Sequence, residues 1–105
     1  MTVVAYVPDL MDRSKVAAAG AAVSFVPTPA ALAEAAASGD VAVVDLARPG
    51  VVDALPALVA TGARVVAFGS HVDRDTLAAA RAAGCEEVLP RSAFFRDLPT
   101  LLATS

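Results

Sequence analysis

The feature that most constrains the fold of this chain is an alternation, repeated five times, of a short apolar segment with a helix-forming segment. The apolar segments are rich in valine, which favours strands, and they are short enough to be strands rather than buried helices. The segments between them are rich in alanine, which favours helix. Strands are expected at 2–7, 23–26, 41–46, 63–68 and 87–89. Helices are expected at 10–19, 29–38, 52–60, 74–83 and 98–103.

Individual residues refine this pattern at the borders and in the interior of the helices. Asp73 and Asp97 stand where N-caps are expected, and Pro56 is expected to weaken the helix at 52–60. The first helix carries four side chains at helical spacing, which are Leu10, Met11, Ser14 and Ala18.

The strands at 41–46 and 63–68 have apolar residues at consecutive positions instead of at alternate ones. This pattern is typical of strands that are buried on both faces of a parallel sheet. Strand and helix units joined by right-handed crossovers form a doubly wound α/β sandwich. With 105 residues, we expect a single domain that spans 1–105.

Composition narrows the functions that this chain can have. The net charge is −3 and the 8 basic residues are scattered, so no basic stripe is available for a phosphate backbone and we expect no nucleic-acid binding. No apolar run approaches the ~20 residues of a membrane-spanning helix, and the N-terminal pattern is not that of a signal peptide. We therefore expect a cytoplasmic protein without membrane association. The single cysteine, Cys85, excludes an internal disulfide.

The candidate site residues follow from the fold class. In doubly wound folds the functional crevice lies beyond the carboxyl ends of the strands. The polar residues in and just after these positions are Asp9, Asp12, Asp45, Ser70, His71 and Arg91.

Two stretches resemble a known family. Asp45 ends the apolar third strand and is followed by Leu46 and, four positions on, by Pro49, while residues 83–92 read AGCEEVLPRS. Both stretches resemble the phosphoacceptor loop and the fifth strand of bacterial response-regulator receiver domains. The resemblance implies a flavodoxin-like fold, a five-stranded parallel sheet of order 2-1-3-4-5 in a three-layer α/β/α sandwich. It also implies that Asp45 is a phosphoacceptor or its relic.

The chain departs from the receiver pattern at three positions that phosphoryl transfer requires. The resemblance places the family's acidic pair at Val7 and Pro8, its hydroxyl residue at Gly69 and its lysine at Arg91. Transfer of a phosphoryl group to a carboxylate needs a divalent cation held by nearby acids. We therefore expect a stand-alone degenerate receiver, or pseudo-receiver, that signals by protein–protein interaction and is neither an enzyme nor dependent on a cofactor or metal.

Alternatives stay open at the acidic residues. Asp45 is either the acceptor or a turn carboxylate that caps the following loop. Asp9 is expected to be an N-cap, and Asp12 is expected to be a solvated position of the helix. Both are weak candidates for Mg²⁺ ligands, and only if the protein is an atypical phosphoacceptor. Arg91 is expected either to pair with Asp45 across the crevice or to be exposed.

The remaining candidates concern ligands and partners. Ser70 and His71 would be the polar contacts if the crevice bound a small molecule or had enzymatic activity, whereas a lone histidine in a loop is commonly exposed. Phe94 and Phe95 are adjacent, so their side chains should point apart, with one less buried than the other. The resemblance suggests that the face near the last helix contacts an unidentified protein partner or a second copy of the chain.

Overall fold

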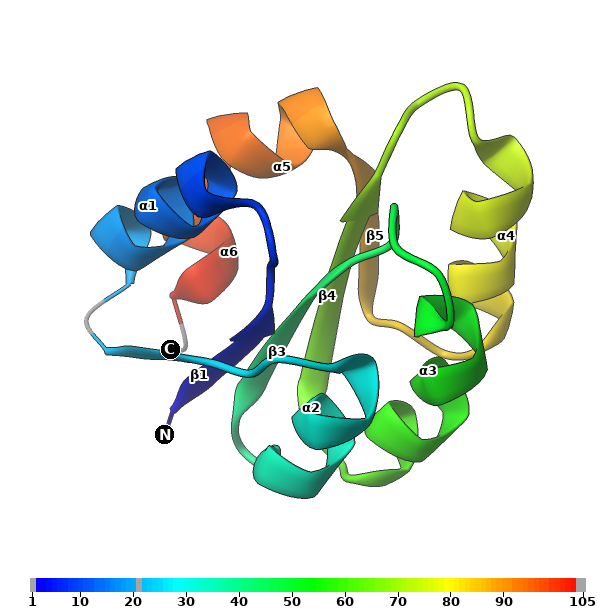
Figure 1. Ribbon diagram of the computed structural model, residues 1–105, viewed down its shortest axis with the longest axis horizontal. Coiled ribbons are helices and arrows are strands. Elements are labelled where there is room, and N and C mark those ends of the chain that lie inside the picture. The colour runs from blue at the N-terminus through cyan, green and yellow to red at the C-terminus, as the bar shows by residue number, and fades with distance from the viewer. Residues whose placement is uncertain (1, 21, 104–105) are drawn as a thin grey trace.

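The computed structural model describes residues 2–20 and 22–103, and its central feature in this part of the chain is a five-stranded sheet (Figure 1). The strands are β1 (Val3–Tyr6), β2 (Val23–Phe25), β3 (Val41–Asp45), β4 (Arg64–Gly69) and β5 (Glu87–Pro90). The helices are α1 (Leu10–Ala19), α2 (Pro29–Ala35), α3 (Val51–Ala60), α4 (Arg74–Ala82), α5 (Arg91–Arg96) and α6 (Leu98–Leu102).

All neighbouring strands are parallel and their order is β2-β1-β3-β4-β5. Val3 of β1 lies opposite Val23 on one side and Val41 on the other, and Val41 in turn lies opposite Arg64. This is the flavodoxin-like, doubly wound topology, so the predicted fold class is confirmed.

The sheet separates two apolar cores, because successive side chains of a strand point to opposite faces. Val4 and Tyr6 of β1 join the core beneath α2, α3 and α4, whereas Val3, Ala5 and Val7 join the core beneath α1, α5 and α6. Figure 1 shows these two helical layers on either side of the strands. The consecutive apolar residues of the strands are thus explained, since each strand supplies both cores.

Helix α1 packs with a different stripe from the one that the sequence suggested. Leu10 and Met11 are 76% and 72% exposed, and Ser14 and Ala18 are also exposed. The stripe that faces the sheet consists of Asp12, Val16 and Ala19, of which the first two are buried. Apolarity alone misled here, because the inward stripe contains an aspartate.

Two further local predictions differ from the structure, and one helix was not predicted at all. Helix α2 ends at Ala35 rather than near Ser38, because Ala36 takes an extended backbone with φ −79° and ψ 145°. The carboxylate of Asp97 accepts no hydrogen bond from the first turn of α6 and pairs with Arg96 instead. Helix α5, which the sequence did not predict, follows β5 directly.

Other local predictions are confirmed. The Asp73 carboxylate caps α4 by accepting a hydrogen bond from the backbone N–H of Thr76. Helix α3 continues through Pro56 to Ala60.

Within the described residues, no helix has the length and apolarity needed to cross a membrane.

Candidate functional site

The carboxyl ends of the strands lie at the upper edge of the sheet in Figure 1. Several charged residues follow directly after these strand ends in the sequence. Asp9 lies between β1 and α1, and Asp12 lies in the first turn of α1. Asp45 ends β3, Arg48 lies in the loop that follows, and Arg91 begins α5. The elements bring these residues together because every parallel strand ends at this edge.

The strongest contact in the cluster joins Arg91 to Asp12. The Nη1 and Nη2 atoms of Arg91 each donate to one carboxylate oxygen of Asp12, both over 2.9 Å. The Asp12 side chain is 6% exposed and that of Arg91 is 43% exposed. Such a two-pronged, charge-assisted pair fixes the geometry of both side chains, and the hydrogen bonds that Arg91 donates to Asp12 raise the pKa of Arg91.

Two aromatic rings lie next to the guanidinium of Arg91. Its guanidinium carbon lies 5.6 Å from the ring centroid of Phe68 and 5.1 Å from that of Phe95. Two sequence predictions are therefore wrong: Asp12 is not solvated, and Arg91 forms its salt bridge with Asp12 instead of Asp45. The reason is the inward stripe of α1, which points Asp12 toward the start of α5.

Asp45 is buried at the end of β3, with 2% of its surface exposed. Its Oδ1 accepts a hydrogen bond of 2.9 Å from the backbone N–H of Ala47, which forms a turn typical of aspartate. Its Oδ2 lies 3.9 Å from Nε of Arg48. Burial raises the pKa of the Asp45 carboxyl, and the Ala47 N–H and Arg48 oppose this rise. The hydrogen bond expected of a turn carboxylate is therefore present, and the phosphoacceptor role of Asp45 stays an untested prediction.

Asp9 is the N-cap of α1, as the sequence predicted. Its Oδ1 accepts from the backbone N–H of Asp12 over 3.0 Å, and this bond lowers the pKa of the Asp9 carboxyl. The three carboxylates of the cluster thus have three different partners, which are a backbone N–H, the Arg91 guanidinium, and a turn with Arg48 nearby. In residues 2–20 and 22–103, no three potential metal-ligating side chains converge on one point.

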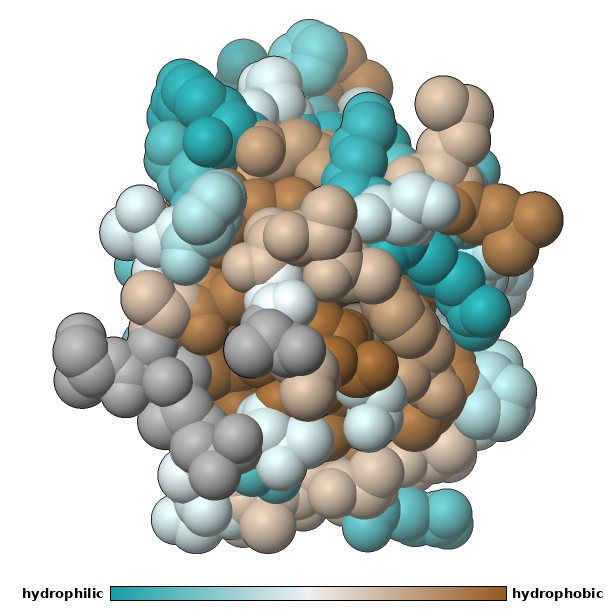
Figure 2. All heavy atoms as spheres, turned by 90° about the vertical axis from the view of Figure 1, so that its left-hand side faces the viewer, coloured by the Kyte–Doolittle hydropathy of each residue, from teal (hydrophilic) through white to brown (hydrophobic). Residues whose placement is uncertain are grey.

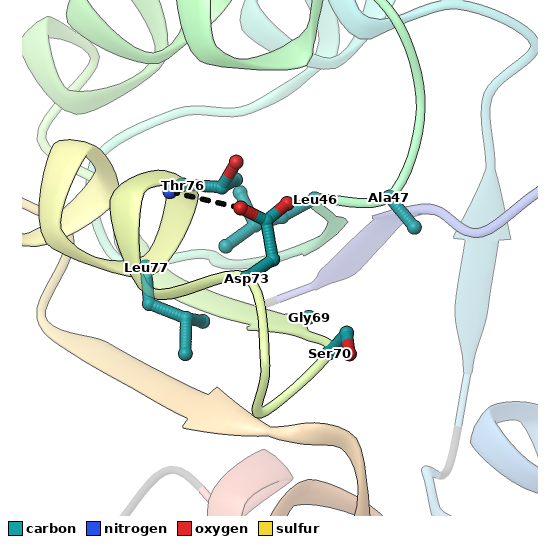
Figure 3. Close-up of a pocket in the computed structure, with 7 residues that line it drawn as sticks. All are labelled: Leu46, Ala47, Gly69, Ser70, Asp73, Thr76 and Leu77. Atoms are coloured by element: carbon teal, nitrogen blue, oxygen red, sulfur yellow. Dashed lines mark hydrogen bonds between the residues drawn. The ribbon is translucent and has the colours of Figure 1, made fainter.

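A small pocket lies beside Ser70, between the end of β3 and the start of α4 (Figure 3). Its volume is about 30 Å³, and it is lined by Leu46, Ala47, Gly69, Ser70, Asp73, Thr76 and Leu77. The Ser70 hydroxyl accepts from the N–H of Val72 over 3.4 Å, and Figure 3 shows the Asp73 carboxylate directed at the N–H of Thr76. His71 is exposed and does not line the pocket. The structure therefore does not bring Ser70 and His71 together on one ligand site.

Phe94 and Phe95 differ in burial, as expected. Phe94 is fully buried and stacks on Phe68 with centroids 4.2 Å apart. Phe95 is half-buried and meets both rings edge-on. Its ring also lies 5.0 Å from the ammonium of Lys15 in α1.

Sequence reasoning missed two charged residues that shape this region, Lys15 and Arg48. Lys15 is the only lysine of the chain and lies three positions after Asp12 in α1. Arg48 lies three positions after Asp45. For Arg48 the spacing from Asp45 was a usable signal, whereas the spacing of Lys15 from Asp12 would have predicted a pair that the structure does not form.

Comparison of the sequence with known proteins gives no match to a family model and none to a curated protein. The function is therefore inferred from the fold and from the contacts of the charged cluster.

Proposed function

We propose that this chain is a degenerate receiver-like module that signals by binding a separate protein, and that Asp45 does not take up a phosphoryl group in a magnesium-dependent reaction. The flavodoxin-like topology is compatible with this proposal, but the same fold supports many functions. The observation that carries the proposal is the ion pair between Arg91 and the buried carboxylate of Asp12.

The ion pair engages Asp12, the carboxylate that a bound cation would need as a ligand. A phosphoryl acceptor requires a divalent ion whose carboxylate ligands lie beside it. Both oxygens of Asp12 are bound to Arg91, so Mg²⁺ would have to displace two charge-assisted hydrogen bonds. Val7, where receivers carry an acid, is 0% exposed in the apolar core beneath α1. A carboxylate at that position would be buried without a partner.

The position of Asp45 supports the same conclusion. A carboxylate nucleophile needs an accessible oxygen. The Asp45 side chain is 3% exposed, and one of its oxygens already accepts the Ala47 N–H. These contacts are those of a residue that holds the loop before α3 in place.

The alternative of a small-molecule binder or enzyme receives no comparable support. The pocket beside Ser70 has a volume of about 30 Å³. Because about 10–15 Å³ of this space is enough for one water molecule, the pocket has room for only a few waters. A protein-binding role needs no pocket at the crevice and no cofactor.

A thermal-shift measurement tests the proposal. The parent protein, Asp45→Ala and the control Asp53→Ala are heated with and without Mg²⁺ and beryllofluoride, which mimics a bound phosphoryl group. Asp53 is an exposed aspartate of α3 and serves as the matched control. A ligand present at 100 times its Kd would stabilise the fold by about 2.7 kcal/mol, which is several degrees for a domain of this size.

We expect no shift that depends on Mg²⁺ and beryllofluoride in any of the three proteins. A shift in the parent and in Asp53→Ala that disappears in Asp45→Ala would contradict the proposal and would favour the atypical phosphoacceptor.

A further inference from the structure

An open groove runs between α1 and the last two helices and adjoins the charged cluster at Phe95, whose ring also lies beside Arg91. Its volume is about 360 Å³, and it is lined by Lys15, Ala18, Ala19, Phe95, Leu98 and Pro99. Figure 2 shows the side of the molecule on which α1 and α6 lie, where apolar side chains gather in the middle of the face and hydrophilic ones lie mainly toward its upper part.

The groove combines an aromatic wall with a floor of small residues. Phe95 is half-buried, so part of its ring is available to a partner. Ala18 and Ala19 have short side chains, which let another chain approach the backbone of α1 closely. Exposed aromatic surface beside small residues is the type of surface in which a partner's apolar side chains are buried.

The one charge in the groove is positive. Lys15 lies over the Phe95 ring at 5.0 Å and forms no salt bridge with any carboxylate in the described part of the chain. On a helix surface its natural partner would be Asp12, three positions earlier. Both oxygens of Asp12 are held by Arg91, so Lys15 is not neutralised by the carboxylate nearest to it along the helix.

We propose that this groove binds the apolar face of an amphipathic helix from a partner protein, with a carboxylate of that helix beside Lys15. The inference rests on the proposed function only in that the chain acts by binding a protein. Binding of a helix in a groove uses apolar anchors three to four residues apart, and a flanking carboxylate would fix the orientation by charge complementarity.

A second copy of the chain fits the groove less well. In a two-fold symmetric contact the same surface meets itself. Two Lys15 ammonium groups would then face each other across the groove without a carboxylate from the groove lining to separate them. Like charges brought together in this way oppose association.

Two designed peptides test the inference. Each is about 18 residues long, capped at both ends, and carries leucines on one helical face. In the first peptide glutamates flank the leucines, and in the second lysines replace the glutamates. Binding is followed by the backbone amide resonances of the ¹⁵N-labelled protein. We expect the glutamate peptide to shift Ala18, Phe95 and Leu98, and the lysine peptide to bind more weakly.

Variants at exposed positions of α1 locate the contact. We expect Lys15→Glu and Ala18→Gln each to weaken binding of the glutamate peptide by about tenfold or more. Ala17→Gln, on the same helix but outside the groove, and Arg74→Glu, on α4, should leave binding unchanged. The amide spectrum of each free variant checks that the fold is intact.

Several results would overturn the inference: no binding of the glutamate peptide, equal binding of both peptides, equal effects of Ala17→Gln and Ala18→Gln, or self-association through the groove in sedimentation velocity. None of these results changes the outcome expected with Mg²⁺ and beryllofluoride, so the two proposals can fail separately.

Discussion

At Arg91, one guanidinium neutralises Asp12, lies over two aromatic rings and connects α5 to α1. The carboxylate that it holds is almost fully buried. A buried charge that loses its partner keeps its full desolvation cost. The energetic role of the pair is therefore best seen when one partner is removed.

We expect Arg91→Ala to lower the free energy of unfolding by about 2 kcal/mol, because it leaves the Asp12 carboxylate buried without a cation. The cost is at the lower end for buried pairs because Arg91 is partly solvent-screened, at 43% exposure. The double variant with Asp12→Asn should lose less than the sum of the two single variants. Urea denaturation measures all three variants, and strict additivity would contradict the pairing.

The raised pKa of Asp45 gives a prediction with a defined sign. Because burial disfavours its ionised form, the folded state binds the proton more tightly than the unfolded state does. Stability attributable to this group then falls as pH rises from the ordinary aspartate value of about 3.9 to the raised folded-state value. Asp45→Asn keeps an oxygen for the Ala47 N–H and removes the charge.

We expect Asp45→Asn to raise the melting temperature by a few degrees at neutral pH, with the gain disappearing below the ordinary aspartate pKa. Thermal melts across this pH range provide the measurement. A variant that is less stable than the parent at pH 7 would show that the Arg48 contact outweighs burial.

Local roles at the site could be predicted from the sequence, and long-range pairs could not. The Asp9 cap and the Asp45 turn depend on residues two or three positions away. The pair of Arg91 and Asp12 joins residues that are 79 positions apart. To predict this pair, one must first know which face of α1 points toward the sheet. That face was misjudged because Leu10 and Met11 are the apolar residues of its first turn, yet both are exposed.

At the level of the elements, helix α3 contains an internal proline, and the weakening expected from it stays a prediction. Pro56 is exposed and lies in the middle of Val51–Ala60, where it cannot donate a hydrogen bond to the carbonyl of Val52. Pro29 differs, since it lies at the start of α2, where no such donor is needed.

We expect Pro56→Ala to raise the free energy of unfolding by about 2 kcal/mol, because the interior cost of proline outweighs the restriction that it places on the unfolded chain. Pro29→Ala is the matched control and should give no gain. Chemical denaturation compares the two. Equal effects would mean that α3 has already adapted to its proline.

Most helices and strands could be predicted from the sequence. The spacing of their apolar residues and the residues at their ends depend only on neighbouring positions in the chain. The exceptions depend on tertiary packing. Helix α2 ends early where Ala36 becomes extended and buried, although alanine itself favours helix. Helix α5 has only six residues and its central side chain, Phe94, is held by stacking on Phe68. Such a short segment has little helical preference of its own.

At the scale of the whole molecule, the buried parallel sheet between two cores followed from the alternation of segments and from the consecutive apolar residues of β3 and β4. The order of the strands was expected only from the resemblance to receiver domains. The fold brings the crevice to one edge and the apolar groove to the α1 and α6 side. Under the proposed function, in which the ion pair occupies Asp12, the groove is the surface that we propose for a partner.

The most direct test is the intact mass of the protein after incubation with Mg²⁺ and a small phosphodonor, with Asp45→Ala treated in parallel. Because Asp12 is bound to Arg91 and Asp45 is buried, we predict an unchanged mass for both proteins. An added mass of one phosphoryl group in the parent that is absent from Asp45→Ala would contradict the account and identify Asp45 as a working acceptor.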